Sequence, residues 1–237
     1  MLILPDNADM DHLLEASNAF ASGASTILEE LLPTKEIVRY KDANKSDPVT
    51  NVDLRIEDYL KREISREFPD HSIIAEETDD QTIESSDFVW VIDPLDGTKN
   101  LSAGLPFYSV SIGLLYLGIP IIGSILMPDS VMSNGLYSCK LGGGAYRNGE
   151  RLGILNSPGH KVSDLSVVPS GFRQSFSMVG DSTRASGSSN RVFGELGTMG
   201  SIASEMVLVA RGIFGSGIFS GGHIWDVAAG ILLIREA

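Results

Sequence analysis

The chain has 237 residues, enough for one substantial hydrophobic core or for two closely joined halves. Its formal net charge of −13 disfavours nucleic acid and anionic membranes as main partners, because both require basic patches. The single cysteine and the lack of any run of about 18 apolar residues are typical of a soluble, cytoplasmic protein without a membrane span.

The first half of the chain opens with two predicted helices joined by a polar connection. Apolar side chains recur at helical spacing from Asp9 to Leu32, and a second helix is predicted from about Val52 to Phe68. The stretch from Thr34 to Ser46 carries four cationic residues and is typical of a solvated connection. Asp47 and Asp53 stand at the start of the second helix, where turn and cap residues are common.

The next predicted element is a strand from His71 to Glu77 that ends in two acids. Neighbouring residues of a strand point to opposite faces, so Glu76 and Glu77 would face one metal ion only if the chain bends there. The polar segment from Asp79 to Asp87 predicts a loop that leads to the following strand.

The stretch W-V-I-D-P-L-D-G-T, residues 90–98, is the most informative part of the chain. Phe88 to Ile92 is apolar and β-branched or aromatic, which predicts a buried strand. Proline donates no hydrogen bond, so Pro94 predicts that the strand stops there.

Two carboxylates, Asp93 and Asp96, directly follow that predicted strand. Gly97 allows the backbone to approach a ligand closely, and Thr98 stands at a predicted helix start. Oxygen ligands of this kind suit Mg²⁺, and a helix N-terminus suits a phosphate. An ordinary Asp-rich turn is the alternative explanation for the two aspartates alone.

Several strands are predicted after this stretch. Tyr108–Leu117 and Ile119–Met127 form a predicted antiparallel pair, and Leu136–Ser138 is a further short strand. The triple glycine at 142–144 has no following G-K-[ST], so a hairpin with an Asn148-Gly149 turn explains it better than a phosphate loop.

The last quarter of the chain predicts two helices and two short strands. The strands are expected within Ser163–Gly171 and Ile213–Phe219, and the helices within Gly200–Ala210 and Trp225–Arg235. The segment from Phe172 to Arg191 is rich in Ser, Gly and Arg. No G-x-S-x-G motif and no zinc-ligand spacing occur, and the acidic candidates favour a hard divalent cation.

Taken together, residues from about 9 to the last resemble the inositol monophosphatase family of Mg²⁺-dependent, lithium-sensitive phosphatases. Two motifs carry most of the resemblance, W-V-I-D-P-L-D-G-T at 90–98 and W-D-x-A-A-G at 225–230. Weaker matches to D-x-V-T-x-x-D, G-x-G-A-x-x-N-G and G-[ST]-A-A begin at 47, 142 and 200.

The resemblance implies the fold and the domain organisation. The implied class is α/β (α+β), a layered α-β-α-β-α sandwich of the type shared with fructose-1,6-bisphosphatase. It implies one catalytic domain over 1–237, with an α+β half at about 1–140 and an α/β half at about 141–237. The chain stops where relatives continue with another strand, so we expect another chain or a shortened sheet to cover its last helix. The family usually forms homodimers, which makes a homodimer the expected assembly.

The resemblance also implies a site that holds two or three Mg²⁺ ions. The implied metal ligands are Glu76, Asp93, the Leu95 carbonyl, Asp96, Asp226 and, for the weakest ion, Asp47. The implied catalytic residues are Glu76, as base for the attacking water, with Thr98 and Asp47. The implied substrate-binding residues are Asp96, Gly97, Thr98, Gly200, Ser201, Ile202, Phe219 and Asp226. Asp53 is expected to be a helix cap, and a lysine of the polar connection is expected near the metal site.

The implied activity is hydrolysis of a small phosphate ester by attack of a metal-activated water. Fructose-1,6-bisphosphatase, histidinol-phosphatase and 3′-phosphoadenosine phosphatase activities are alternatives, and a regulatory metal-binding protein with weak turnover is an alternative of another class. Three positions depart from the family pattern: Gly197 replaces an arginine, Ile202 a small residue, and Phe219 a glutamate that binds sugar hydroxyls. The last two predict that inositol-1-phosphate is not the preferred substrate.

Overall fold

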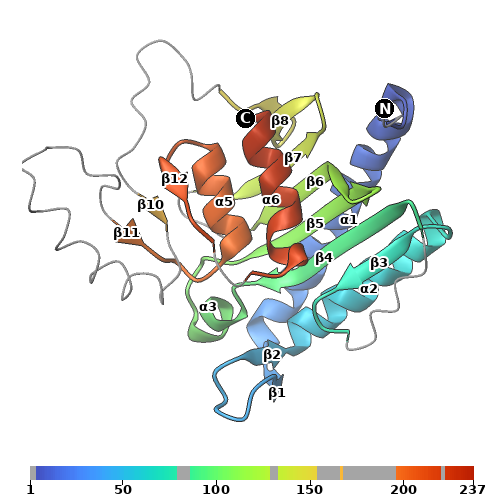
Figure 1. Ribbon diagram of the computed structural model, residues 1–237. Coiled ribbons are helices and arrows are strands. Elements are labelled where there is room, and N and C mark those ends of the chain that lie inside the picture. The colour runs from blue at the N-terminus through green and yellow to red at the C-terminus, as the bar shows by residue number, and fades with distance from the viewer. Residues whose placement is uncertain (1–3, 79–85, 129–132, 154–165, 168–195, 220–221) are drawn as a thin grey trace, which may run out of the picture.

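The computed structural model describes residues 4–78, 86–128, 133–153, 166–167, 196–219 and 222–237. Its centre is a seven-stranded mixed sheet (Figure 1). In spatial order the strands are β3 (Ser72–Ala75), β4 (Phe88–Asp96), β5 (Ser109–Tyr116), β6 (Ile119–Met127), β7 (Gly135–Lys140), β8 (Gly144–Arg147) and β9 (Glu150–Arg151). The β3–β4 pair is parallel, and the other neighbours pair in the antiparallel sense.

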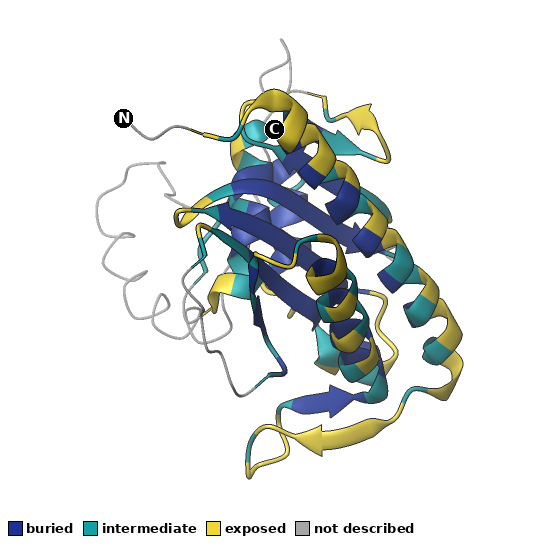
Figure 2. Ribbon diagram, turned by 90° about the vertical axis from the view of Figure 1, so that its right-hand side faces the viewer, coloured by how far each residue is buried: buried dark blue, intermediate teal, exposed yellow. Residues whose placement is uncertain are grey.

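Helices cover both faces of this sheet (Figure 1). One face carries α1 (Asn7–Leu31) and α2 (Asn51–Glu67), and the other carries α5 (Ile202–Ala210) and α6 (Ile224–Glu236). Figure 2 shows the central strands largely buried, whereas helices on the near side expose their outer faces. The predicted helices are therefore confirmed, and none of those in the described part of the chain is both long and apolar enough to cross a membrane.

A second, smaller sheet lies beside α5 (Figure 1). Its three parallel strands are β11 (Leu196–Gly197), β10 (Ser166–Val167) and β12 (Ser216–Gly217). This arrangement is the mixed α/β class that the sequence predicts, with a central mixed sheet flanked by helices. The predicted strand over Ile213–Phe219 is only two residues long, because Gly212 and the residues after it form turns at the end of α5.

The polar connection forms a two-stranded hairpin, not a simple loop. It follows a short 3₁₀ turn, η1 (Leu32–Thr34), and consists of β1 (Ile37–Tyr40) and β2 (Pro48–Thr50) in antiparallel pairing. At its end, Thr50 and Asp53 form a capping box that starts α2, with the Thr50 backbone N–H donating to Asp53 Oδ2 over 3.0 Å. The cap role predicted for Asp53 is thus confirmed.

The prediction that Pro94 ends the central strand was wrong. β4 continues through Pro94 to Asp96. Its pairing with β5 skips between Asp93 and Asp96, so the missing proline N–H falls where the ladder is already interrupted. The irregular end of β4 then leads through Gly97 into the short helix α3 (Thr98–Ala103), as predicted.

The Ala-Ala-Gly part of the last motif lets α6 lie very close to the sheet. A Cβ added to Gly123 of β6 would stand 2.8 Å from the Ala229 carbonyl oxygen, and one added to Gly113 of β5 would stand 3.0 Å from Ala228 Cβ. Larger side chains at these positions would push the helix away from the sheet. This close packing fixes the start of α6, where Asp226 lies.

Candidate active site

Chain segments far apart in the sequence line one cavity of about 370 Å³. Ends of the central strands contribute Glu76 and the 93–96 turn, α3 contributes its first residues, and α5 and α6 contribute their starts. The residues that line it are Asp47, Glu76, Asp93, Leu95, Asp96, Gly97, Thr98, Lys99, Thr198, Gly200, Ser201, Ile202, Glu205, Phe219 and Asp226. Every candidate site residue named from the sequence is among them.

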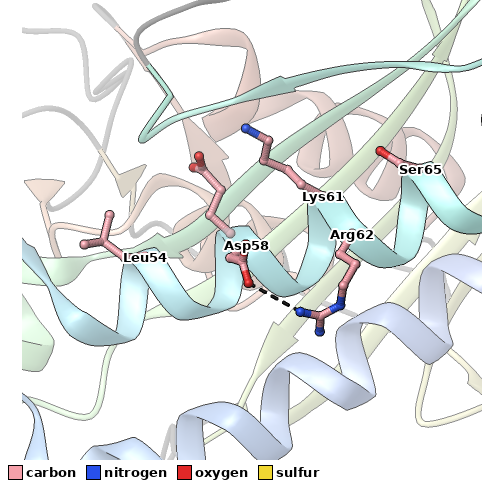
Figure 3. Close-up of a pocket in the computed structure, with 6 residues that line it drawn as sticks. Leu54, Asp58, Lys61, Arg62 and Ser65 are labelled. Atoms are coloured by element: carbon pink, nitrogen blue, oxygen red, sulfur yellow. Dashed lines mark hydrogen bonds and ion pairs between the residues drawn. The ribbon is translucent and has the colours of Figure 1, made fainter.

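Another cavity of similar volume lies on α2, where Asp58 and Arg62 form the ion pair drawn in Figure 3. Its charged side chains bond one another or nearby residues: Lys61 donates to the Thr78 hydroxyl over 2.8 Å. All the residues lining it come from one helix, and none belongs to a motif. The cavity at the end of β4 is therefore the better candidate site.

Asp93 is the most deeply buried of the acids in this cavity, with 1% of its surface exposed. Its Oδ1 accepts the Leu95 N–H over 3.0 Å, which holds the carboxylate across the irregular turn. Burial, and then the charges of Glu76 and Asp96, raise the pKa of Asp93 well above its usual value. An ionised Asp93 therefore requires a cation nearby.

Asp96 and Asp226, which also line the cavity, have raised pKa values for the same main reason. Burial raises the pKa of Asp96 to about 7, although the Ser201 hydroxyl and the Ala203 N–H donate to its Oδ2 over 2.8 and 2.6 Å. Burial also raises the pKa of Asp226, whose Oδ2 accepts the His223 N–H over 2.7 Å. Each carboxylate is thus fixed through one oxygen by an N–H group and electrostatically unsatisfied.

The carboxylate set fits a hard divalent cation. One oxygen each of Asp93, Asp96 and Asp226 is held by the backbone, which leaves the second oxygen for a ligand. Across the described residues, no three Asp, Glu, His or Cys side chains already surround a single point as a complete metal site. Small rotations of these carboxylates would be needed, since Asp93 lies within hydrogen-bonding distance of Glu76 and Asp226.

Glu76 and Glu77 part at the end of β3. The strand stops at Ala75 and the chain bends at both glutamates, so Glu76 lines the cavity whereas the Glu77 side chain is buried behind it. Burial raises the pKa of Glu77 to about 7, opposed by its bond to Lys41. Both glutamates lie beyond the end of β3, so the bend that the sequence analysis required sets their directions, and both carboxylates reach the Lys41 ammonium group.

The Thr98 hydroxyl contacts Asp53, a residue that was expected only to cap α2. The Thr98 hydroxyl lies 2.7 Å from Asp53 Oδ1 and 2.9 Å from the Leu95 carbonyl oxygen, and its single proton can be donated to only one of them. Asp53 is buried and its other oxygen caps α2. The acid beside Thr98 is therefore Asp53, while Asp47 lies on the hairpin side of the cavity. Spacing in the D-x-V-T-x-x-D motif did not show which of its aspartates would reach Thr98.

Loop 199–201 is held in place by side chains that the sequence analysis did not single out. The buried Glu205 accepts the N–H groups of Met199 and Gly200, and the Asn100 amide donates to the Met199 carbonyl over 2.7 Å. This anchoring positions the start of α5 against Asp96. The position of Glu205, five residues after Gly200 at the start of the G-[ST]-A-A match, is the sequence feature that could have indicated this role.

Two apolar side chains also line the cavity. Ile202 and Phe219 line it, and Phe219 also packs on the hydrophobic core beneath α5 and α6. A phosphate ester in this cavity would thus meet both carboxylates and hydrocarbon. Gly197, the third departure from the family pattern, lies in β11.

The raised pKa values predict a pH-dependent stability that Mg²⁺ should remove. A carboxyl group whose pKa is raised on folding stabilises the protonated native state, and this stability is lost as the pH rises from about 4 to about 7. We expect the Tm of metal-free protein to fall over this range, and Mg²⁺ to raise the Tm more at pH 7.5 than at pH 5. Calorimetry at constant ionic strength, with KCl as control, measures both; an equal Mg²⁺ effect at both pH values would contradict this prediction.

Comparisons with known proteins show which family the chain resembles. The profile of the inositol monophosphatase family matches residues 9–237. A fructose-1,6-bisphosphatase/inositol-1-monophosphatase from Aquifex aeolicus is 31% identical over 94% of this chain and 83% of its own length. Nus factor SuhB from Escherichia coli is 32% identical over 96% and 84%. The structure of an inositol monophosphatase from Anabaena superposes with a TM-score of 0.74 at 26% identity, covering 96% of this chain and 82% of that one.

Proposed function

Because the chain belongs to the inositol monophosphatase family, we propose that it is a Mg²⁺-dependent phosphomonoesterase acting on a small phosphorylated metabolite. The observation that carries this proposal is the cavity itself, in which carboxylates from the ends of β3 and β4 and the start of α6 meet Gly97 and Thr98. The family is generally magnesium-dependent, and acids held in this way bind Mg²⁺ well.

The proposed roles follow from the position of each group. Glu76, Asp93, Asp96, Asp226, the Leu95 carbonyl and Asp47 would hold two or three Mg²⁺ ions. When bound, these ions supply charge neutralisation for the phosphate and lower the pKa of water. The Gly97 and Thr98 amides, at the start of α3, would hold phosphate oxygens.

Glu76 and the Thr98–Asp53 pair would act together on the attacking water. Glu76 lines the cavity and would accept the proton of the attacking water. The Thr98 hydroxyl, when it donates to Asp53, would present its oxygen to the same water and orient it. Phosphoryl transfer depends mainly on positioning and charge neutralisation, so no covalent intermediate is needed.

The alcohol part of the substrate would contact the apolar wall. Ile202 and Phe219 offer no hydrogen-bond acceptor to a polyol, so we propose that a flatter or less hydroxylated ester is preferred over inositol-1-phosphate. Phosphate release from a panel tests both the class and the preference. The panel comprises inositol-1-phosphate, fructose 1,6-bisphosphate, histidinol phosphate and 3′-phosphoadenosine 5′-phosphate, each with and without Mg²⁺. If none of these esters released phosphate with Mg²⁺ present, the proposed class of enzyme would be contradicted.

A regulatory metal-binding protein with weak turnover is the second candidate. It is favoured by the 32% identity to a relative named Nus factor SuhB. The same panel separates the two, since a regulatory protein would release little phosphate from every ester.

Three further properties stay predictions from the family resemblance: a single catalytic domain over 1–237, a homodimer and inhibition by lithium. A cytoplasmic location stays a prediction from the composition.

A further inference from the structure

The β1 strand of the hairpin reaches the rest of the molecule through charged side chains, whereas β2 is buried. All four residues of β1 are exposed, and Ile37 and Val38 have 43% and 52% of their surface accessible. The pairing with β2 is itself irregular after Ile37. The side chains that reach the body from this strand and the residue after it are Arg39 and Lys41. Both contact the acidic end of β3.

Lys41 places its ammonium group between the two glutamates. Its Nζ lies 2.6 Å from Glu76 Oε1 and 2.6 Å from Glu77 Oε1. The Lys41 side chain keeps only 25% of its surface accessible, and that of Glu76 24%, so the pair is partly shielded from water. Ion pairs that are shielded in this way are screened less by salt than exposed ones.

Arg39 supplies a second positive charge, and it is directed at Glu77 alone. Its guanidinium donates to Glu77 Oε2 over 3.1 Å and to the Glu77 carbonyl oxygen over 3.2 Å. On the other side, the Glu77 N–H donates to Glu57 Oε2 over 2.7 Å. Glu77 therefore has a charge partner without Lys41, and the charge of Lys41 is available to Glu76.

Glu76 both binds Lys41 and lines the cavity. One of its oxygens is bound by Lys41, and its carboxyl group also lies within hydrogen-bonding distance of Asp93. A Mg²⁺ ion that binds Glu76 must therefore approach a fixed positive charge or displace it. Like charges at such distances repel each other strongly in a partly dehydrated site.

We propose that Lys41 is a tethered cation that competes with Mg²⁺ for Glu76 and sets the metal affinity of the site. This inference rests on the proposed role of Glu76 as a metal ligand. In the metal-free protein Lys41 neutralises Glu76. In the loaded protein its charge weakens the binding of the Mg²⁺ ion that Glu76 holds. Removing the charge strengthens Mg²⁺ binding, whereas removing a residue that merely orients Glu76 would weaken it.

The test is Mg²⁺ titration of metal-stripped protein by isothermal calorimetry, on wild type, Lys41→Met and Lys41→Arg. We expect Lys41→Met to lower the Kd for Mg²⁺ roughly 3- to 30-fold, by less at high salt, and Lys41→Arg to stay near wild type because it keeps the charge. The Mg²⁺ concentration that gives half-maximal phosphate release should fall in proportion.

Lys45→Met is the matched control, because it removes one lysine from the same hairpin and changes the net charge equally. Lys45 is exposed, and its ammonium lies 5.9 Å from the centre of the Tyr40 ring, remote from the glutamates. The Kd of Lys45→Met for Mg²⁺ should equal that of wild type. An unchanged or higher Kd in Lys41→Met, with wild type binding Mg²⁺ normally, would overturn the inference and leave the proposed function intact. A wild type that binds no Mg²⁺ would instead overturn the proposed function, and the inference with it.

Discussion

The Asp93→Asn variant is expected to lose phosphate release by roughly a thousandfold or more and to remain folded. A metal ion contributes several kcal/mol of charge stabilisation in such reactions, and each 1.4 kcal/mol is a factor of about ten in rate. Asparagine keeps the oxygen that accepts the Leu95 N–H, so the local backbone is preserved while the charge is removed. Steady-state phosphate release with saturating Mg²⁺ measures the loss.

The same substitution should make the metal-free protein more stable. Burial and the charges of Glu76 and Asp96 oppose ionisation of Asp93, so a neutral side chain there relieves the repulsion. We therefore expect a higher Tm without metal at pH 7.5 and a smaller rise on adding Mg²⁺. Loss of activity with a lower metal-free Tm would indicate misfolding in place of metal loss.

Asp87→Asn provides the matched control at the other end of the same strand. Asp87 is exposed just before β4, and its backbone carbonyl, which accepts the Leu117 N–H, is unaffected by the change. Activity and Mg²⁺ response should match wild type. An Asp93→Asn enzyme that turned over as fast as this control would refute the proposed role of Asp93 as a metal ligand.

The positions of the acids were predictable from the sequence because they depend on local rules. The apolar run before Asp93 predicts a strand, and β4 delivers that acid to the end of the sheet. A helix is likewise predicted over Trp225–Arg235, and Asp226 in its first turn, expected at the site from the family resemblance, lines the same cavity. In such regular strands and helices, the spacing of residues determines the direction in which each side chain points.

Partners that come from remote segments were not predictable in the same way. The bond between Thr98 and Asp53 joins residues 45 positions apart, and the Lys41–Glu76 pair joins residues 35 apart. Which aspartate or lysine reaches the site depends on how the hairpin and α2 pack on the sheet. The run to Pro94 misled for a related reason, because the tolerance for proline came from the pairing with β5.

Glycines 142–144 make a tertiary contact that their local sequence does not predict. Their sequence predicts only a hairpin, and the Asn148-Gly149 turn is observed with both residues at positive φ. The N–H groups of Gly142 and Gly144, however, each donate over 2.8 Å to the Glu236 carboxylate at the end of α6. Nothing in the local pattern indicates an acid 92 or more residues away.

The Phe219→Glu variant is expected to shift selectivity toward inositol-1-phosphate. In wild type the polyol would meet Ile202 and Phe219, neither of which accepts a hydrogen bond. A buried hydroxyl without a partner costs about 1–3 kcal/mol. That cost corresponds to roughly a 5- to 150-fold loss for each such hydroxyl, at about tenfold per 1.4 kcal/mol. A carboxylate at this position would supply the missing acceptor.

The measurement is the ratio of kcat/KM for inositol-1-phosphate to that for each other ester of the panel. Phe219 packs on the core under α5, so Tm must be followed in parallel. The new carboxylate also adds charge to an acidic cavity, and Phe219→Gln separates the two effects because it accepts hydrogen bonds without charge. Phe219→Leu, which stays apolar, should keep the wild-type ratio. If wild type already prefers inositol-1-phosphate about tenfold over every other ester, the apolar wall does not contact the alcohol part of the substrate, and the selectivity must arise elsewhere in the cavity.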